Sequence, residues 1–286
     1  MTPIIQVKGL QHRYPNGFHA LRGVDVEINR GEFVAVIGQN GSGKTTFVKH
    51  LNGLLRATEG AVIVDGKDVS KHPVSEMARS VGYCFQNPDH QIFCDTVQAE
   101  VAYGPKNLRL SQAEIDERVE EALEAVGLGH VRGENPRYLS KGQRQRVAVA
   151  AVLSMHPQVL TVDEPTTGQD YQDGLDMLNL IKRLNTAGHT VLFITHDMPM
   201  VARFAQRVLV FRDGQILLDG TTREVFGKPQ ELQTTFLAPP QIASLSQALP
   251  EYFPDTALSV TEMLDWTLKA LEKRQPKKHA TEVRPS

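Results

Sequence analysis

Short apolar runs bounded by turn residues recur along this chain of 286 residues. Their length and their content of β-branched residues predict buried strands. The predicted strands span residues 4–7, 23–28, 33–37, 61–64, 81–85, 159–162 and 190–194, and a hairpin joins residues 208–211 to 215–218. Helical patterns lie between them, most clearly at residues 44–55 and 115–126. This alternation of strands and helices predicts an α/β fold.

The stretch before the strand at residues 159–162 has a different character and predicts a helical insertion over about residues 87–142. One helical face carries its apolar positions, which are Ile115, Val119, Ala122, Leu123 and Val126. Acidic residues surround that face, which is the pattern of a solvated helix surface and not of an active site.

Residues 226–272 carry two further apolar stripes at helical spacing, which together are too small for an independent core. The first stripe is Ile242, Leu245 and Leu249, and the second is Val260, Met263, Leu264, Leu268 and Leu271. They must pack either on the rest of the chain or on the same segment of a second chain, and we expect the second. The flank of the second stripe holds Trp266. Residues 273–286 are polar and basic and predict a disordered tail.

The strand at residues 33–37 leads into Gly38-Gln39-Asn40-Gly41-Ser42-Gly43-Lys44-Thr45-Thr46, which fits G-x-x-x-x-G-K-[ST] at every position. A strand before it and a helix after it disfavour a chance glycine-rich turn. Glycines let backbone N–H groups surround a β-phosphate, and the helix N-terminus adds its positive dipole. We expect Lys44 to reach the β- and γ-phosphates and the Thr45 hydroxyl to coordinate Mg²⁺. The motif predicts the core of a P-loop NTPase.

Polar residues follow three other predicted strands, at the edge of an α/β sheet where ligands bind. Gln86 follows the strand at residues 81–85 and is a candidate contact for the γ-phosphate or Mg²⁺. Asp163 and Glu164 follow the strand at residues 159–162; the first is suited to hold Mg²⁺ and the second to polarise an attacking water. His196 follows the strand at residues 190–194, and we expect it to act at the same edge.

Two other features leave alternatives open. The sequence Leu139-Ser140-Lys141-Gly142-Gln143 has Ser140 placed to cap a helix, and taken alone it fits a capped basic helix as well as a binding site. Tyr14 lies on a loop before the phosphate loop, where it either stacks on a base or packs at a strand edge. Composition alone favours packing.

Net charge, apolar runs and cysteine spacing limit the expected cellular location and the expected binding partners of the protein. The net charge of −2 does not suggest broad nucleic-acid binding. No apolar run approaches the roughly 18 residues of a membrane span, and the first residues lack the pattern of a signal peptide. Cys84 and Cys94 are ten residues apart without a C-x-x-C motif, which predicts buried thiols in a reducing compartment. We therefore expect a cytosolic protein.

The ordered set of motifs resembles that of the nucleotide-binding subunit of an ATP-binding cassette transporter, over about residues 4–225. It comprises residues 38–46, Gln86, residues 139–143, Asp163-Glu164, residues 167–170 and His196. The resemblance implies a mixed sheet, an antiparallel β subdomain and a helical insertion subdomain within a cassette at residues 1–225. It also implies that Tyr14 stacks on adenine. Two chains would enclose two ATP molecules, with Ser140, Gly142 and Gln143 of each chain contacting ATP on the other.

Two segments are similar to the ATPases of energy-coupling factor importers and their cobalt or nickel relatives. They are residues 86–93 and the extension around Pro239-Pro240. This resemblance implies an ATP- and Mg²⁺-dependent motor for uptake of a vitamin or a transition-metal ion. Its expected partners are a second copy or a related ATPase and integral membrane subunits, without nucleic acid, at the cytoplasmic side of the membrane. The alternatives are an exporter motor and a soluble cassette ATPase acting on nucleic acid or the ribosome. The soluble type would need a long coiled coil or two cassettes.

In this family Glu164 would be the general base, His196 would hold the γ-phosphate and water, and Lys44 and Gln86 would complete the catalytic set. The sequence departs from the family at Lys141, where glycine is usual. Its ammonium would either approach the phosphates on a second chain or reach solvent along its flexible stem. We expect the second.

Overall fold

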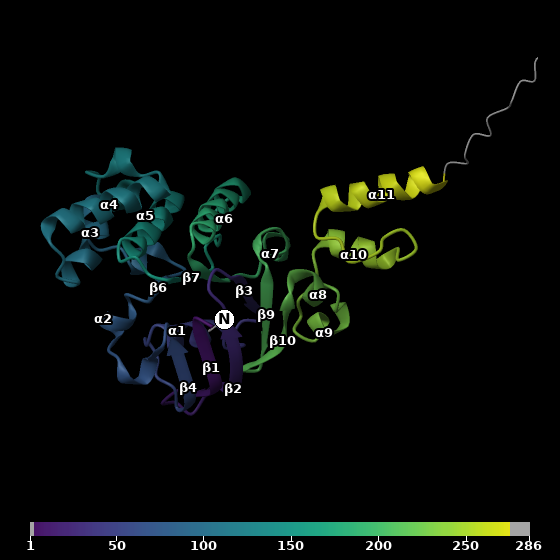
Figure 1. Cartoon of the computed structure of the whole chain (residues 1–286), viewed down its shortest axis with the longest axis horizontal. Coiled ribbons are helices and arrows are strands. Elements are labelled where there is room, and N and C mark those ends of the chain that lie inside the picture. The colour runs from purple at the N-terminus through teal and green to yellow at the C-terminus, as the bar shows by residue number, and fades with distance from the viewer. Residues whose placement is uncertain (1–2, 275–286) are drawn as a thin grey trace, which may run out of the picture.

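The structure is a computed structural model that describes residues 3–274. Two sheets form its centre (Figure 1). A four-stranded antiparallel sheet has the order β2-β1-β4-β5, and a six-stranded mixed sheet has the order β10-β9-β3-β8-β7-β6. The strands are β1 (Ile5–Arg13), β2 (His19–Ile28), β3 (Phe33–Gly38), β4 (Glu59–Val64), β5 (Lys67–Asp68), β6 (Val81–Cys84), β7 (Val159–Asp163), β8 (Thr190–Ile194), β9 (Arg207–Arg212) and β10 (Gln215–Thr221). The predicted mixed sheet and antiparallel subdomain are confirmed.

Helices cover the mixed sheet and extend from it. They are α1 (Lys44–Leu51), α2 (Val74–Met77), α3 (Val97–Asn107), α4 (Gln112–Val126), α5 (Lys141–Leu153), α6 (Tyr171–Thr186), α7 (Met198–Phe204), α8 (Thr222–Phe226), α9 (Pro229–Gln233), α10 (Gln241–Ala248) and α11 (Val260–Arg274). Short 3-10 turns lie at Val69–Lys71, Pro88–His90, Gly129–Val131 and Pro136–Tyr138. None of the helices within residues 3–274 is long and apolar enough to cross a bilayer.

The parallel strands end together at one edge of the mixed sheet. β3 pairs with β8 and β9, β8 with β7, and β7 with β6, all in parallel. Side chains of β3 alternate between two cores, because successive residues of a strand point to opposite faces. Phe33, Ala35 and Ile37 belong to the core under α3 to α7, whereas Val34 and Val36 belong to the core shared with α1 and the antiparallel sheet.

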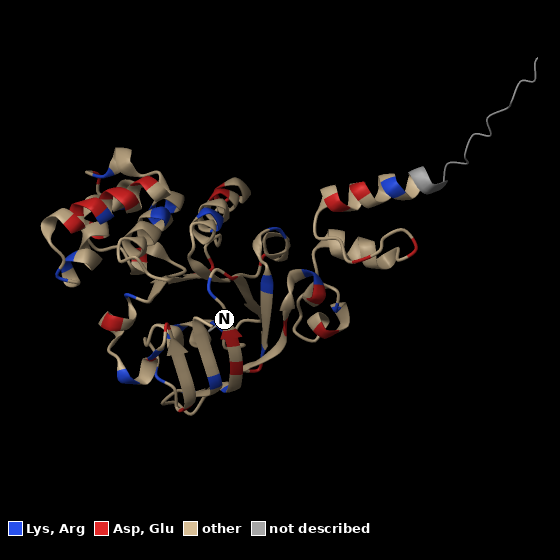
Figure 2. Cartoon of the chain, in the orientation of Figure 1, with Lys and Arg blue, Asp and Glu red and all other residues tan. Residues whose placement is uncertain are grey.

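The helical layer of α3, α4 and α5 lies at one end of the mixed sheet (Figure 1). α4 begins with a capping box between Ser111 and Glu114 and ends at Gly127, which has a left-handed φ of 72°. The five predicted apolar positions of α4 are all buried. Asp and Glu residues recur along α4, as the red segments of its ribbon show (Figure 2).

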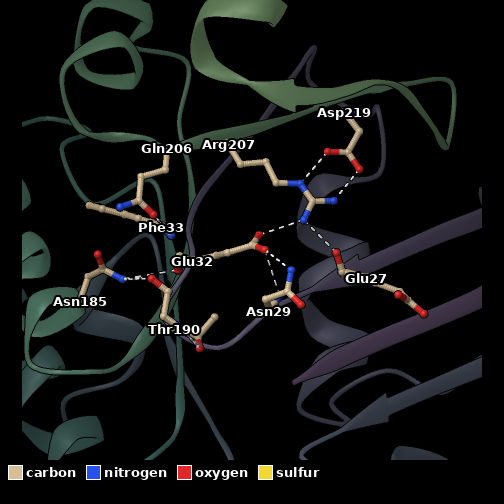
Figure 3. A network of polar contacts seen from close by, with 10 residues as sticks. Glu27, Asn29, Glu32, Phe33, Asn185, Thr190, Gln206, Arg207 and Asp219 are labelled. Carbon is tan, nitrogen blue, oxygen red and sulfur yellow. Dashed lines mark hydrogen bonds and ion pairs between the residues drawn. The ribbon is translucent and has the colours of Figure 1, made fainter. Parts of the chain in front are cut away.

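A polar network joins the two sheets at the edge opposite the phosphate loop (Figure 3). Arg207 on β9 makes a two-pronged contact with Asp219 on β10, with both N–O distances at 2.7 Å. One of its nitrogens also donates to the Glu32 carboxylate and to the Glu27 carbonyl of β2, each at 2.9 Å. The network therefore fixes the antiparallel sheet against β3, whose other end carries the phosphate loop.

The wrong predictions include two element boundaries and the burial of one cysteine. β1 continues to Arg13 through irregular pairing at Gly9, where φ is 55°, and was predicted to end at residue 7. α1 ends at Leu51 and not at residue 55, because Gly53 takes a left-handed φ of 76°. Cys84 is buried as expected, but Cys94 is only half-buried, since it lies in the irregular stretch between β6 and α3.

The segment after α8 first packs against the main core and then forms a separate small cluster. Leu232 of α9 and Ala243 of α10 are fully buried in the core under the mixed sheet. Phe253, Ala257 and Met263 form a separate small cluster, against which Trp266 packs. α11 runs through Arg274, so the predicted disordered tail is helical at its first two residues and otherwise lies outside the described residues.

Candidate nucleotide-binding site

The phosphate loop connects β3 to α1 in the left-handed turns that glycine permits. Gly41 has a φ of 79° and Gly43 a φ of 106°. A Cβ on Gly43 would lie 2.8 Å from the Ala20 carbonyl oxygen, so only glycine fits there. Lys44 curls back over the loop and donates to the carbonyls of Gly38 and Gln39, both at 2.8 Å.

The loop fits a nucleotide phosphate group. No side chain caps the N-terminus of α1, which leaves its first N–H groups and the helix dipole facing the loop. Within residues 3–274, the Ser42 hydroxyl is buried without a hydrogen-bond partner. Burial lowers the pKa of Lys44, while Glu164 and Asp163 oppose that shift. An anion bound in this loop would accept hydrogen bonds from the N–H groups of α1 and the Ser42 hydroxyl, and it would pair with the Lys44 ammonium.

A buried carboxylate lies beside the loop. Asp163 at the end of β7 accepts hydrogen bonds from the Tyr83 hydroxyl at 2.8 Å and from the Thr45 hydroxyl at 3.2 Å. Burial raises the pKa of Asp163, and these two hydrogen bonds oppose the shift. Burial, together with the charge of Asp163, also raises the pKa of the Tyr83 phenol, which keeps that hydroxyl a donor. Mg²⁺ is commonly held by one or two carboxylates together with substrate phosphates, which suits this arrangement.

Glu164 has a strained backbone and a converging set of polar neighbours. Its φ is 46°, in the left-handed region that non-glycine residues rarely occupy, and such strain concentrates at functional sites. One carboxylate oxygen accepts from Gln86 Nε2 at 3.0 Å and from the Thr167 hydroxyl at 2.7 Å. The other lies 3.5 Å from His196 Nδ1. Gln86, Glu164 and His196, predicted from three separate strands, therefore come together.

One open cleft connects these groups. It is lined by residues 38–41, 43–46, Gln86, Asp163, Glu164, His196, Phe18, Ala20, Phe236 and Leu237. It follows that the phosphate-loop, carboxylate, glutamine and histidine positions predicted from the sequence share one site. Within residues 3–274 there is no group of three or more His, Cys, Asp and Glu side chains arranged to hold a metal ion without other ligands.

Tyr14 lies beyond the cleft, next to α1. Its hydroxyl is 3.1 Å from the Thr46 hydroxyl, and its ring packs edge-on against His12. His50 binds the Thr46 carbonyl through Nδ1 at 2.7 Å, so that nitrogen is the donor. Its Nε2 lies 3.1 Å from His12 Nδ1, and burial, together with His12, lowers the pKa of His50. His50 and His12 thus support the segment that carries Tyr14.

The segment at residues 139–143 stands apart from the cleft within one chain. Ser140 accepts from the backbone N–H of Gln143 at 3.2 Å, and the Gln143 side chain bonds back to Ser140. The predicted helix cap is therefore confirmed, as a complete capping box. Neither residue lines the cleft, and neither does Gly142. Lys141 is exposed as expected, but its ammonium is bound and not free, because it donates to the Thr167 carbonyl at 2.8 Å.

Sequence reasoning missed Tyr83, which donates to Asp163, and the cleft-lining residues Phe18, Ala20, Phe236 and Leu237. Thr167 lies in a motif identified from the sequence, but its hydrogen bond to Glu164 was not predicted. Tyr83 lies within an apolar strand, and its hydroxyl was the only feature in the sequence that could have indicated a polar role. Phe236 is 87% exposed and has a φ of 54°, which no sequence pattern indicated.

The two thiols are poor nucleophiles. Burial raises the pKa of Cys84 to about 12. Burial and the nearby Glu100 raise the pKa of Cys94 to about 11. Neither cysteine lines the cleft.

The fold and the site define an ATP-binding cassette. A family model described as ABC transporter matches residues 21–167. The energy-coupling factor transporter ATP-binding protein EcfA of Methanocaldococcus jannaschii is 42% identical over 248 residues, covering 86% of this chain and 89% of the relative. The namesake from Methanoculleus marisnigri is 43% identical, covering 87% and 90%.

Solved structures agree with these relatives. The cbiO1 protein of Clostridium perfringens, described as part of the ABC transporter complex cbiONQ, has a TM-score of 0.75 and 34% identity, covering 88% of this chain and 97% of that chain. The cassette MJ0796, in a dimeric post-hydrolysis state bound to ADP and phosphate, has a TM-score of 0.68 and 30% identity, covering 77% and 99%.

This chain belongs to the ABC transporter family. Among its relatives it is similar to the EcfA proteins and to cbiO1. An ABC transporter ATP-binding protein of Caldanaerobacter subterraneus subsp. tengcongensis is 50% identical over 92% of this chain, but the chain spans 46% of that relative's length. It spans 40% and 41% of the length of two Methanosarcina relatives.

Proposed function

We propose that this chain is the ATP-hydrolysing motor subunit of a membrane importer of the energy-coupling factor type. The solute would be a vitamin or a transition-metal ion such as cobalt or nickel. The observation that carries the proposal is the convergence of Glu164, Gln86 and His196 on one side of the phosphate loop. Family membership and the EcfA and cbiO1 relatives support it.

In this proposal the residues of the cleft divide the chemistry. Residues 38–46, with the Lys44 ammonium among them, hold the β- and γ-phosphates, and Tyr14, which lies beyond the cleft beside α1, stacks on the adenine. Thr45, Asp163 and Gln86 would hold Mg²⁺, which supplies charge neutralisation between the β- and γ-phosphates. Glu164 orients and polarises the attacking water as general base, and His196 holds the water and the γ-phosphate.

The site is completed by a second cassette, either a copy of this chain or a related ATPase. Ser140, Gly142 and Gln143 do not line the cleft of their own chain, which is what an interchain role requires. The exposed start of α5 would meet the γ-phosphate on the other cassette and place fixed donors where charge develops.

Binding and hydrolysis can be tested separately. Lys44→Ala removes the buried cation and should weaken ATP binding at least about tenfold, since a charge-assisted hydrogen bond is lost. Lys8→Met, at an exposed position of β1, should bind ATP as the wild type does. Fluorescent-nucleotide titration measures both. Unchanged affinity in Lys44→Ala would contradict the phosphate-binding assignment.

We place the membrane partner in a groove of about 700 Å³ between the helical layer and the segment near Gln86. Phe93 and Tyr103 are exposed there, with their rings packed edge to face at 4.7 Å. The buried carboxylate of Glu100 fixes the loop below by accepting from the N–H groups of Phe93 and Cys94. An exposed aromatic pair on a fixed support is suited to receive an apolar segment of a transport subunit.

This placement predicts that Tyr103→Glu separates two activities. The substitution is on the surface, so ATPase activity of the isolated protein should stay within about twofold. Co-purification with a multi-spanning membrane protein from detergent-solubilised membranes should be lost. A soluble role is indicated instead if the wild-type protein captures no membrane protein. If the Tyr103→Glu variant still co-purifies with the membrane protein, the docking site lies elsewhere on the chain.

We further propose that residues 1–225 are the cassette and that residues 226–272 form a dimerisation extension. α11 exposes Val260, Leu264, Leu268 and Leu271 by 72%, 53%, 50% and 55%. The same helix contributes Met263 and Trp266 to the small cluster around Phe253. Figure 1 shows α11 extending away from the two sheets. A contact that persists when the cassettes part would raise their effective concentration for reclosure.

Point substitutions test this better than truncation, because removing the extension would also strip Leu232 and Ala243 from the main core. Leu264→Glu with Leu268→Glu should convert a nucleotide-free dimer to a monomer in sedimentation analysis. Lys269→Glu, on the same helix, should leave the dimer intact. Equal masses for all three proteins would assign the stripe to another role.

A further inference from the structure

Lys141 connects two segments that carry different parts of the proposed site. It is the first residue of α5, directly after the cap residue Ser140. Its ammonium donates to the carbonyl of Thr167, three residues after Glu164. Gly168 leaves room for this approach, because a Cβ there would lie 2.3 Å from the lysine nitrogen.

Thr167 extends the connection to Glu164. Its hydroxyl donates to Glu164 Oε2 at 2.7 Å, and Gln86 donates to the same oxygen at 3.0 Å. These two donors hold one carboxylate oxygen and direct the other toward His196. The backbone of Glu164 is also strained, with a φ of 46°, and such a conformation persists only where surrounding contacts hold it.

We propose that Lys141 is a positioning residue that acts through Thr167 to fix the orientation of the Glu164 carboxylate. The inference rests on the proposed role of Glu164 as general base. It gives the lysine a function within its own chain, away from the phosphates of the second cassette. Because α5 begins where the second cassette is proposed to bind, Lys141 also couples closure at one ATP site to the hydrolytic carboxylate of the other.

Four variants test this pathway. Lys141→Met removes the cation and keeps the stem, Lys141→Arg keeps the cation, and Thr167→Val removes only the hydroxyl. The fourth combines Lys141→Met with Thr167→Val. Steady-state ATPase kinetics give kcat and KM for each, with Lys8→Met as the matched surface control and melting temperature as the check on folding.

The proposal predicts a loss in kcat without a change in KM. Lys141→Met should lower kcat about tenfold and change KM for ATP by less than twofold, and Lys141→Arg should recover at least a third of the wild-type kcat. The double variant should be no slower than the slower single variant, because both changes interrupt one pathway.

Other outcomes overturn the proposal. A higher KM in Lys141→Met that persists beside Thr167→Val would mean that the lysine contacts the phosphates of the second cassette. Wild-type kcat in Lys141→Met would mean that it has no role in hydrolysis. If Glu164→Gln hydrolyses ATP normally, the proposed function itself fails, which distinguishes that failure from a failure of the Lys141 pathway alone.

Discussion

Replacing Arg207 with methionine should destabilise the protein by about 3 kcal/mol. Methionine retains much of the arginine stem but removes the guanidinium. Four hydrogen bonds are lost, two to Asp219, one to Glu32 and one to the Glu27 carbonyl (Figure 3). Two carboxylates then remain without their cation.

The magnitude follows from the partial exposure of the network. The side chains of Arg207, Glu32 and Asp219 are 23%, 21% and 34% exposed. A fully buried hydrogen bond to a charged group contributes about 1.5–3 kcal/mol, and a surface ion pair about 0–1 kcal/mol. Because the contacts with Glu32 and Asp219 are partly exposed, their contribution to the free energy of unfolding lies between these two ranges. Adding the hydrogen bond to the Glu27 carbonyl gives a total of about 3 kcal/mol. That corresponds to a fall of about 5 °C in melting temperature for a chain of 286 residues.

Calorimetry or circular dichroism measures the effect, with Arg30→Met as the control. Arg30 is 56% exposed and pairs with Asp65 alone among carboxylates of the described residues, so its removal should cost less than about 1 kcal/mol. If Arg207→Met melts within about 2 °C of Arg30→Met, the network does not hold the two sheets together as argued.

Two further predictions concern titratable groups. The lowered pKa of His50 means that the unfolded chain binds more protons below about pH 6.5, so stability should be full above that pH and should fall as the pH decreases. The wild-type melting temperature should therefore drop more between pH 7.5 and pH 5.5 than that of His50→Gln, and equal drops would contradict the lowered pKa of His50. With a pKa raised to about 11, the Cys94 thiol should react with iodoacetamide at pH 7.5 about 100-fold more slowly than an unperturbed thiol, and rapid labelling would contradict this environment.

The sequence predicted the parts of the molecule that follow a regular pattern of apolar and polar residues. Apolar runs marked the strands, and the polar residues after them were correctly expected at one edge, because parallel strands of one sheet end together. Boundaries failed where backbone conformation decides them, as at Gly53 and in the irregular pairing of β1. Glycine adopts left-handed and right-handed φ values about equally readily, so its presence in a sequence does not show where a helix or strand ends.

Contacts between distant residues were beyond the sequence pattern. Lys141 and Thr167 are 26 residues apart, and their hydrogen bond depends on the packing of α5 beside the turn after β7. Tyr83 and Asp163 are 80 residues apart and meet through the pairing of β6 with β7. Motifs single out Lys141, Thr167 and Asp163, but a motif does not show the strand register or the helix packing that brings such residues into contact.

Hydrolysis by Glu164→Gln tests the central claim most directly. The glutamine keeps the shape of the side chain and its contacts with Gln86 and Thr167 in altered form, but it cannot accept a proton from water. We expect turnover to fall by about 10²–10⁴-fold, which is the usual contribution of a general base. Because the phosphate loop is unchanged, the variant should retain about one intact ATP per chain after rapid gel filtration, as a closed dimer. Hydrolysis at the wild-type rate, or failure to retain ATP, would contradict the account.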